Sequence, residues 1–347
     1  MKKWFFLLLI IISVTVLFLY INTSTKPTIN PRNTPTPSEK PLLAYTFENL
    51  RKTTFPISNI KLNRPFSETP DSTAQIFYFE TPVKPNSTDN NTVSGLMNIP
   101  KKSGKYPIIV LLRGFVPEEI YEPGVGTQHV AEAFAQHGFI TLAPDFLGFG
   151  ESSPTSADSF EARFQTYTTA LTLLSSLSTL NDGLQASNSG ISSDSTKIGI
   201  WGHSNGGHIA LSILELSGLP YPTVLWAPVS KSFPYSILFY SDDSKDHGKA
   251  LRLVLAHFER DYDVDLFSPI NYYSWIKAPI SIYQGDIDDA VPLQWSQDLA
   301  SILKENNVSA AYHVFNGDHN MVPSWSEAVK SSISFFDSKF STNDLVQ

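Results

Sequence analysis

A serine between two glycines is the first feature of this chain that could do chemistry. Gly202, Ser204 and Gly206 have the spacing G-x-S-x-G. This spacing is typical of a nucleophile elbow, a strained turn between a strand and a helix that exposes the serine hydroxyl. A serine hydroxyl is a poor nucleophile until a base takes its proton and a carboxylate orients that base. The rest of the chain must therefore supply a histidine and an acid.

His319 is the predicted base. It lies in a Gly-Asp-His-Asn stretch between the apolar run at residues 310–315 and a helical pattern at residues 325–339. A loop in this position can bring a distant base over the elbow. His203 flanks the nucleophile and is expected to point away from it. The remaining histidines fit surface or packing roles: His129, His137, His208, His247, His257 and His313.

Three aspartates are candidates for the acid. Asp286, Asp288 and Asp289 all follow the apolar run at residues 279–284. An aspartate in such a loop can also serve as a turn residue or as a helix cap. The residues by themselves leave all three candidates open.

The elements that must position these side chains follow from the apolar pattern. Continuous apolar runs, typical of strands buried on both faces, lie at residues 107–112, 139–143, 197–201, 223–226, 279–284 and 310–315. Helical spacing lies at residues 130–137 and 160–180, from residue 209 onward, and at 325–339. Two earlier β-like runs, at 75–80 and 92–99, predict an antiparallel start. This alternation indicates an α/β fold with a mostly parallel, doubly wound sheet.

The segment from about 229 to 276 separates two predicted strands and is rich in aromatic residues. A connection of this length inside a compact domain usually has a function. We expect a helical cap over the carboxyl edge of the sheet, with a structural excursion as the alternative. Seven aromatic residues could line a substrate pocket there, unless they belong to the core: Phe233, Tyr235, Phe239, Tyr240, Tyr262, Tyr272 and Tyr273.

The N-terminus predicts a membrane anchor. After two lysines, residues 4–21 form an apolar run that only Ser13 and Thr15 interrupt. A run of about eighteen residues is just long enough to span a bilayer, and the lysines favour a cytoplasmic N-terminus. We expect residues 1–21 to be an uncleaved anchor, with a cleaved signal peptide as the alternative. The chain after it would then lie outside the cytoplasm, or be secreted if the segment is cleaved.

Composition sets the remaining limits. Residues 22–41 are rich in Thr, Pro and Ser and read as an extended linker, so a globular domain is expected over residues 42–347. With 25 basic and 33 acidic residues the net charge is −8, which does not suggest a nucleic-acid partner. The chain has no cysteine, which excludes disulfides, thiolate metal sites and a cysteine nucleophile.

From about residue 92 to residue 339 the chain resembles the α/β-hydrolase superfamily, and within it the prolyl-oligopeptidase-like and dienelactone-hydrolase-like serine hydrolases. The resemblance rests on five segments in the right order: Arg113-Gly114-Phe115, APDFLGFGES at 143–152, the elbow, GDIDDAVP at 285–292, and Gly317-Asp318-His319. This superfamily carries its triad in the chain order Ser, Asp, His. The resemblance implies an α/β-hydrolase domain over residues 42–347 with the cap at about 229–276.

The family pattern G-x-x-D-x-x-V-P places the acid at Asp288. The backbone N–H groups of Phe115 and Asn205 are expected to form the oxyanion hole. The relatives usually have His-Gly where this chain has Arg113 and Gly114. We expect Arg113 to pair with a buried carboxylate such as Asp145, and the alternative is that it binds an anionic part of the substrate.

The expected activity is therefore acyl transfer to water by Ser204, Asp288 and His319, with no metal or cofactor required. A carboxylesterase acting on a small-molecule ester is the first interpretation, and a peptidase of the prolyl-oligopeptidase type is the second. Glu118 and Glu119 could receive a substrate amine, but the chain before the catalytic region is too short for a β-propeller. A third interpretation is an inactive, envelope-anchored binding protein.

Overall fold

The computed structural model describes residues 40–187, 190–242 and 245–342. The predicted anchor at 1–21 and most of the predicted linker lie outside the described residues. Within the ranges that are described, none of the helices has both the length and the apolar character needed to cross a membrane.

The described residues form one nine-stranded sheet with the order β1-β2-β3-β5-β4-β6-β7-β8-β9. The strands are β1 (Lys61–Glu68), β2 (Ser72–Pro82), β3 (Asn90–Pro100), β4 (Gly104–Leu112), β5 (Ile140–Pro144), β6 (Ile191–His203), β7 (Thr223–Trp226), β8 (Ile280–Gly285) and β9 (Ala310–Phe315). Pairing is antiparallel from β1 to β3 and between β3 and β5, and parallel in the rest of the sheet. The predicted antiparallel start and the mostly parallel sheet are both confirmed.

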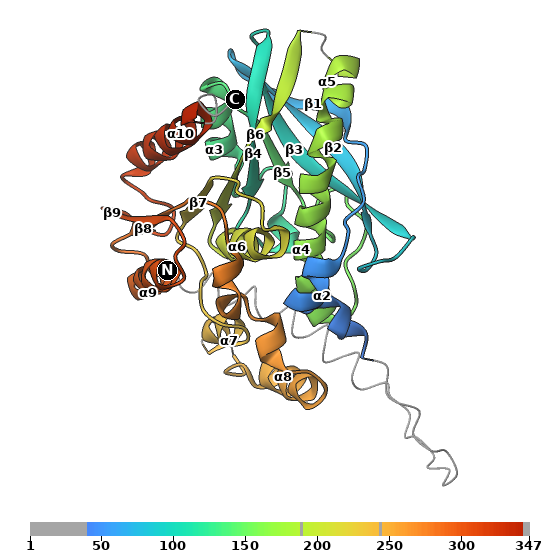
Figure 1. Ribbon diagram of the computed structural model, residues 1–347, viewed down its shortest axis with the longest axis vertical. Helices are drawn as coiled ribbons and strands as arrows, with labels where there is room; N and C mark the ends of the chain where they lie inside the picture. The colour runs from blue at the N-terminus through green and yellow to red at the C-terminus, as the bar shows by residue number, and fades with distance from the viewer. Residues whose placement is uncertain (1–39, 188–189, 243–244, 343–347) are drawn as a thin grey trace.

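Helices cover both faces of this sheet (Figure 1). They are α2 (Phe47–Lys52), α3 (Gln128–Gln136), α4 (Ser159–Ser176), α5 (Leu180–Ser187), α6 (Asn205–Ser217), α7 (Tyr235–Leu238), α8 (Lys249–Asp261), α9 (Leu293–Glu305) and α10 (Trp325–Thr342). Side chains of β4 alternate between the two faces, as the period of a strand requires. Ile108 and Val110 pack with residues of α4 and α6, whereas Ile109 and Leu111 pack with residues of α3 and α10.

Four elements differ from the prediction. β1 was not expected, because this edge strand is mostly exposed and its polar sequence has no apolar run. β6 begins at Ile191 instead of residue 197, since its first half is also polar and partly exposed. The single helix expected at 160–180 is divided into α4, a short 3-10 turn at Leu177–Thr179, and α5. The helix α9 was not predicted either.

The described part of the segment between β7 and β8 is helical and contains α7, α8 and four 3-10 turns. In Figure 1 it lies below α6, at the end of the molecule away from α5. Five of its seven aromatic candidates pack in or against the core, which is the alternative considered above: Phe233, Tyr262, Tyr272 and Tyr273 in one cluster, and Phe239 in the second. Phe239, together with Tyr235 and Tyr240, surrounds Trp295 of α9 at ring distances of 4.8–6.3 Å. Burial, and then the charge of the Asp288 carboxylate, raise the pKa of Tyr240.

Helix α6, which follows the elbow, carries a buried acid. The side chain of Glu215 is fully buried, and within the described residues neither of its carboxylate oxygens has a hydrogen-bond partner. Burial raises the pKa of this carboxyl group well above its usual range. Glu215 therefore destabilises the fold wherever the unfolded chain would ionise it.

We expect Glu215→Met to stabilise the protein by about 1–3 kcal/mol at neutral pH, because it removes unpaired buried oxygens. Because the pKa of Glu215 is higher in the folded than in the unfolded state, its carboxyl group is least destabilising below its unfolded pKa of about 4.5. Its cost to the stability of the fold then increases as pH rises. The advantage of the variant should therefore grow between about pH 4 and pH 8 in urea unfolding experiments. The exposed Glu259→Met is the matched control. An advantage that did not change with pH would contradict the prediction.

Candidate active site

Ser204 occupies the turn between β6 and α6. Its backbone has φ 57° and ψ −119°, a strained conformation for a residue other than glycine. The Ser204 N–H donates to the Trp226 carbonyl at 2.9 Å, which ties the turn to the end of β7. A Cβ at Gly202 would lie 2.6 Å from the Gly206 carbonyl oxygen, and one at Gly206 would collide with the Leu112 carbonyl. Both glycines are therefore needed for the sharp turn that presents Ser204.

His319 and Asp288 are in direct contact. His319 Nδ1 lies 2.9 Å from Asp288 Oδ2 and 3.1 Å from Oδ1, and the Asp288 side chain has no exposed surface. The carboxylate also accepts bonds from Gln284 Nε2 at 2.7 Å and from the N–H groups of Ala290 and Val291 at 2.8 and 2.9 Å. Burial acts to raise the Asp288 pKa, but the bonds and charge of His319 and the two N–H groups outweigh it, so the pKa is lowered. An ionised Asp288 then holds the proton of His319 on Nδ1 and leaves Nε2 free to accept one.

The other two aspartates of this loop have different environments. Asp286 accepts a hydrogen bond from the Gly317 N–H at 2.9 Å, so it fastens the loop that carries His319 to the end of β8. The same loop also packs closely against Gly285, where a Cβ would collide with the Gly317 and Asp318 carbonyls. Asp289 is exposed. The geometry thus distinguishes the three candidates that the residues alone left open.

His203 does not point away from the site, contrary to the prediction. Its Nε2 lies 2.9 Å from the His319 carbonyl oxygen, and the two imidazole rings are 4.6 Å apart. Burial lowers the pKa of His203 to about 4, so the ring is neutral and its Nε2 must carry the hydrogen that it donates. The sequence shows His203 only as a neighbour of the serine, and this contact with a distant loop had no local signal.

His203 is also the link between the nucleophile and the base. It immediately precedes Ser204 and it holds the backbone of His319. Within the described residues, no hydrogen bond joins the Ser204 hydroxyl to the His319 ring. A bond between nucleophile and base is often long without substrate and tightens when substrate binds.

The two predicted oxyanion donors lie on different loops. The Asn205 N–H is at the start of α6, directly after the nucleophile. Phe115 follows Gly114, whose Cβ, if present, would lie 3.0 Å from Ser204 Cβ and 3.6 Å from Ser204 Oγ. The loop after β4 therefore passes against the nucleophile. Among the described residues, neither of these two N–H groups donates a hydrogen bond to a backbone carbonyl.

Arg113 is buried, but it does not pair with the Asp145 carboxylate as expected. Its Nη2 donates instead to the Asp145 backbone carbonyl at 3.1 Å. The carboxylate accepts bonds from Ser94 Oγ at 2.5 Å and from Tyr121 OH at 2.6 Å. These two hydroxyl groups already satisfy the acid, and the arginine is left to contact backbone.

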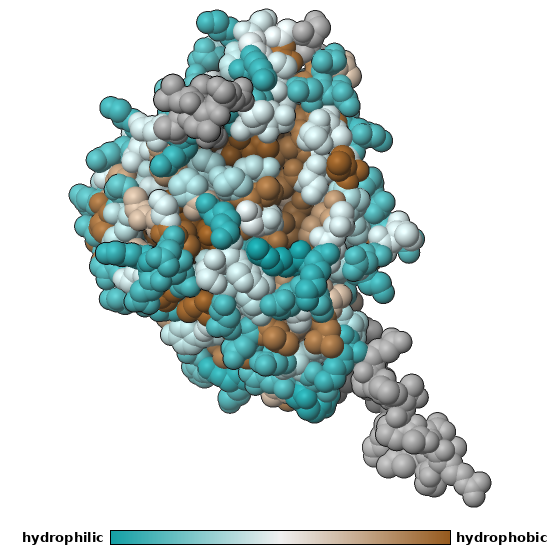
Figure 2. Space-filling model, viewed as in Figure 1, coloured by the Kyte–Doolittle hydropathy of each residue, from teal (hydrophilic) through white to brown (hydrophobic). Residues whose placement is uncertain are grey.

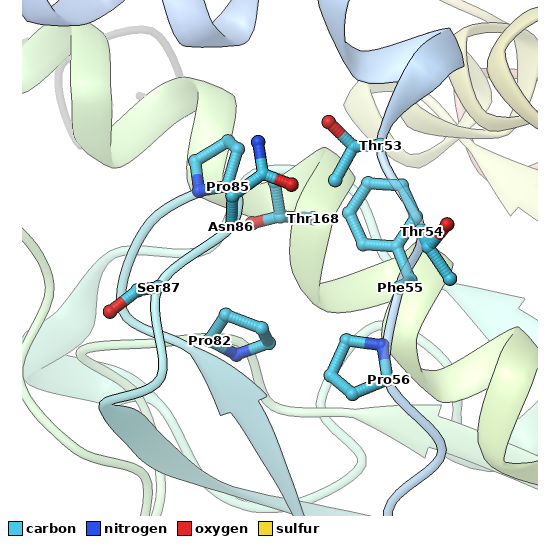
Figure 3. A pocket seen from close by; sticks show the side chains of 9 residues that line it. All are labelled: Thr53, Thr54, Phe55, Pro56, Pro82, Pro85, Asn86, Ser87 and Thr168. Atoms are coloured by element: carbon cyan, nitrogen blue, oxygen red, sulfur yellow. The ribbon is translucent and has the colours of Figure 1, made fainter.

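A separate pocket of about 220 Å³ lies between residues 53–56 and the turn that follows β2, with Thr168 of α4 at its back. Figure 3 shows the side chains that line it: Thr53, Thr54, Phe55, Pro56, Pro82, Pro85, Asn86, Ser87 and Thr168. None of these nine residues is titratable near neutral pH, and none belongs to the predicted site. This pocket therefore has no group for acid–base chemistry.

Comparison with known proteins concerns the fold and the segment that contains the elbow. Residues 73–219 match the chlorophyllase family, a span that includes the elbow but ends before Asp288 and His319. No curated protein matches the chain by sequence.

Solved structures share the fold at low identity. The chain is similar to an acetyl xylan esterase from a Paenibacillus species, with a TM-score of 0.54 and 17% identity over 88% of this chain and 96% of that chain. It is similar to carboxyl esterase 2 from the fungus Tuber melanosporum, with a TM-score of 0.52 and 16% identity over 78% and 89% of the two chains. A protein described as a dipeptidyl aminopeptidase IV from Bacteroides ovatus has a TM-score of 0.51 and 14% identity over 81% of this chain and 36% of its own.

Proposed function

This chain has the α/β-hydrolase fold, and from that premise we propose that it is a serine hydrolase that cleaves esters through an acyl-enzyme on Ser204. The single observation that carries the proposal is the contact of the buried Asp288 carboxylate with His319, whose backbone is bonded to His203 of the elbow. A buried carboxylate that fixes the tautomer of a histidine is the arrangement that a serine nucleophile needs.

The proposed reaction has two halves. Ser204 Oγ attacks the ester carbonyl carbon while its proton passes to His319 Nε2, and the resulting oxyanion is bound by the N–H groups of Phe115 and Asn205. The C–O bond to the alcohol then breaks, and the alcohol leaves with the proton from His319. In the second half, water attacks the acyl-enzyme, His319 takes its proton and returns it to Ser204, and the acid is released.

Apolar side chains next to the proposed catalytic groups favour an uncharged acyl ester. Phe115, Ile287 and Val322 are 70%, 65% and 53% exposed, and they lie on the loops of the oxyanion donor, Asp288 and His319 respectively. Exposed apolar residues on the loops of a site can form part of a ligand-binding region. On the face seen in Figure 2, hydrophobic surface lies toward the middle and polar residues dominate the outline.

A peptidase is the second candidate. The likeness to the Bacteroides ovatus protein and the two exposed acids Glu118 and Glu119 favour it, because acids near the site could bind a substrate amine. The chain spans only 36% of that protein, which weakens this interpretation.

A fluorophosphonate probe tests the proposal on the full-length protein. It should label wild-type protein on a single peptide that contains Ser204, and Ser204→Ala should abolish labelling, with Ser178→Ala as the control. Turnover of p-nitrophenyl esters but not of Pro-anilides would then support an esterase, and the reverse a peptidase. A folded protein that shows neither labelling nor turnover would favour the binding-protein interpretation and refute the hydrolase.

We also propose that residues 1–21 anchor the enzyme in the membrane with its catalytic domain outside the cytoplasm. The support is the apolar run at residues 4–21 and the two lysines before it. Full-length protein should remain in the membrane pellet after carbonate extraction, and protease added to intact cells should digest the catalytic domain. Recovery of a shortened chain from the medium would instead indicate a cleaved signal peptide.

A further inference from the structure

Arg113 is a buried cation next to the predicted site. It directly follows β4, and only 7% of the residue is exposed. Its guanidinium group lies 4.1 Å from the ring centre of Phe149, 4.8 Å from that of Tyr121 and 5.8 Å from that of Phe146. Aromatic faces attract a cation at such distances, and they hold the planar group in one orientation.

Both hydrogen bonds of this guanidinium group go to backbone carbonyls. Nη1 donates to the Gly114 carbonyl and Nη2 to the Asp145 carbonyl, each at 3.1 Å. The group therefore connects the loop after β4 to the loop after β5. A bond from a charged donor is stronger than one between neutral groups, and burial strengthens it further.

The bond to the Gly114 carbonyl fixes more than one oxygen atom. The Gly114 C=O and the Phe115 N–H belong to the same planar peptide group, and in a trans peptide they point in opposite directions. This peptide is trans, because the cis bonds of the described chain precede Pro234 and Pro323. When Arg113 holds the carbonyl, the Phe115 N–H must point away from the guanidinium group.

The same loop lies against the nucleophile. A Cβ at Gly114 would be 3.0 Å from Ser204 Cβ, so the chain here has no room for a side chain between the loop and Ser204. A small rotation of the Gly114–Phe115 peptide would change where the N–H points relative to Ser204 Oγ. Control of this rotation is therefore control of one oxyanion donor.

We propose that Arg113 is a positioning residue for the oxyanion hole. Its charged bond to the Gly114 carbonyl locks the peptide that carries the Phe115 N–H, and it polarises that N–H toward the negative oxygen that forms beside Ser204. The proposal rests on the proposed hydrolase function. It gives Arg113 a role that differs from both expectations in the sequence analysis, since its guanidinium group bonds to two backbone carbonyls.

Steady-state kinetics on p-nitrophenyl butyrate test this role in the full-length protein. Arg113→Met should lower kcat by about 10- to 100-fold with little change in KM, because removal of an oxyanion donor itself costs about 10²- to 10³-fold. The kcat of Arg113→Lys should lie between those of wild type and Arg113→Met, since an ammonium group keeps the charge but lacks the planar fork that reaches both carbonyls. The exposed Arg260→Met is the matched control and should leave both constants unchanged.

Inhibitor binding separates positioning from a merely structural role. A trifluoromethyl heptyl ketone forms an oxyanion when Ser204 adds to it, whereas the corresponding alcohol does not. Arg113→Met should weaken the ketone about as much as it lowers kcat/KM, and it should leave binding of the alcohol unchanged. Equal weakening of ketone and alcohol, or an unchanged kcat in a folded variant, would overturn the proposal.

Further outcomes distinguish a failure of the Arg113 role from a failure to fold or of the hydrolase function. If Arg113→Met does not fold, Arg113→Lys and Phe149→Leu decide by the same comparison, because each disturbs the guanidinium group more gently. If the wild-type protein is not labelled by the fluorophosphonate probe and has no turnover, the hydrolase function is refuted and this role with it. A labelled, active wild type with indifferent variants refutes the Arg113 role alone.

Discussion

Replacement of His319 by alanine is expected to lower kcat for ester hydrolysis by about 10⁶-fold, the loss typical of removing the base from a serine triad. The physical reason is that Ser204 would keep its proton, since Asp288 contacts the histidine and not the serine hydroxyl. Residual hydrolysis would come from the oxyanion donors and from substrate binding, so KM should change far less than kcat. Single-turnover and steady-state assays with p-nitrophenyl esters measure both constants.

His313→Ala is the control for this experiment. His313 is exposed on β9 and lies outside the proposed site, so its replacement should leave activity within about twofold, as is usual for surface positions. If His319→Ala retained a tenth or more of the wild-type kcat, His319 would not be the base.

Asp288→Asn is expected to lower kcat by about 10⁴-fold while the protein remains folded. An amide has nearly the same shape as the carboxylate, but its NH₂ group faces His319 Nδ1 as a donor and favours the tautomer that carries the proton on Nε2. That tautomer cannot accept the serine proton. The two backbone N–H bonds from Ala290 and Val291 can still reach the amide oxygen, which limits the structural change.

The pH dependence of stability gives an independent check on the same residue. The folded-state pKa of Asp288 is lowered, so its contribution to stability is complete above the unfolded pKa of about 3.8 and is lost as pH falls. The free energy of unfolding of Asp288→Asn should therefore be lower than that of wild type above about pH 4, and the two values should converge below that pH. Asp289→Asn, at an exposed position, is the control for both activity and stability. Equal activity of the Asp288 and Asp289 variants would contradict the assignment.

Much of the fold could be predicted because it depends on local pattern. Strands buried on both faces have continuous apolar runs, and β4 was recognised in this way from residues 107–112 and β7 from residues 223–226. β1 and the first half of β6 were missed because their residues are polar and partly exposed. Their place in the sheet is decided by pairing with a neighbouring strand, which has no signature in the residues themselves.

The sequence by itself determined the elbow. The close approach of α6 to β6 requires glycine at 202, its close approach to the end of β4 requires glycine at 206, and both glycines are visible in five consecutive residues. It also supplied a histidine and three aspartates on the correct loops. The family pattern implied Asp288 as the acid, and the tertiary structure shows its contact with His319. Only the tertiary structure decided that His203 holds the His319 backbone across 116 residues, and that Arg113 bonds to carbonyls instead of a carboxylate. These contacts join loops that follow different strands, so they depend on distances and burial that exist only after the sheet has formed.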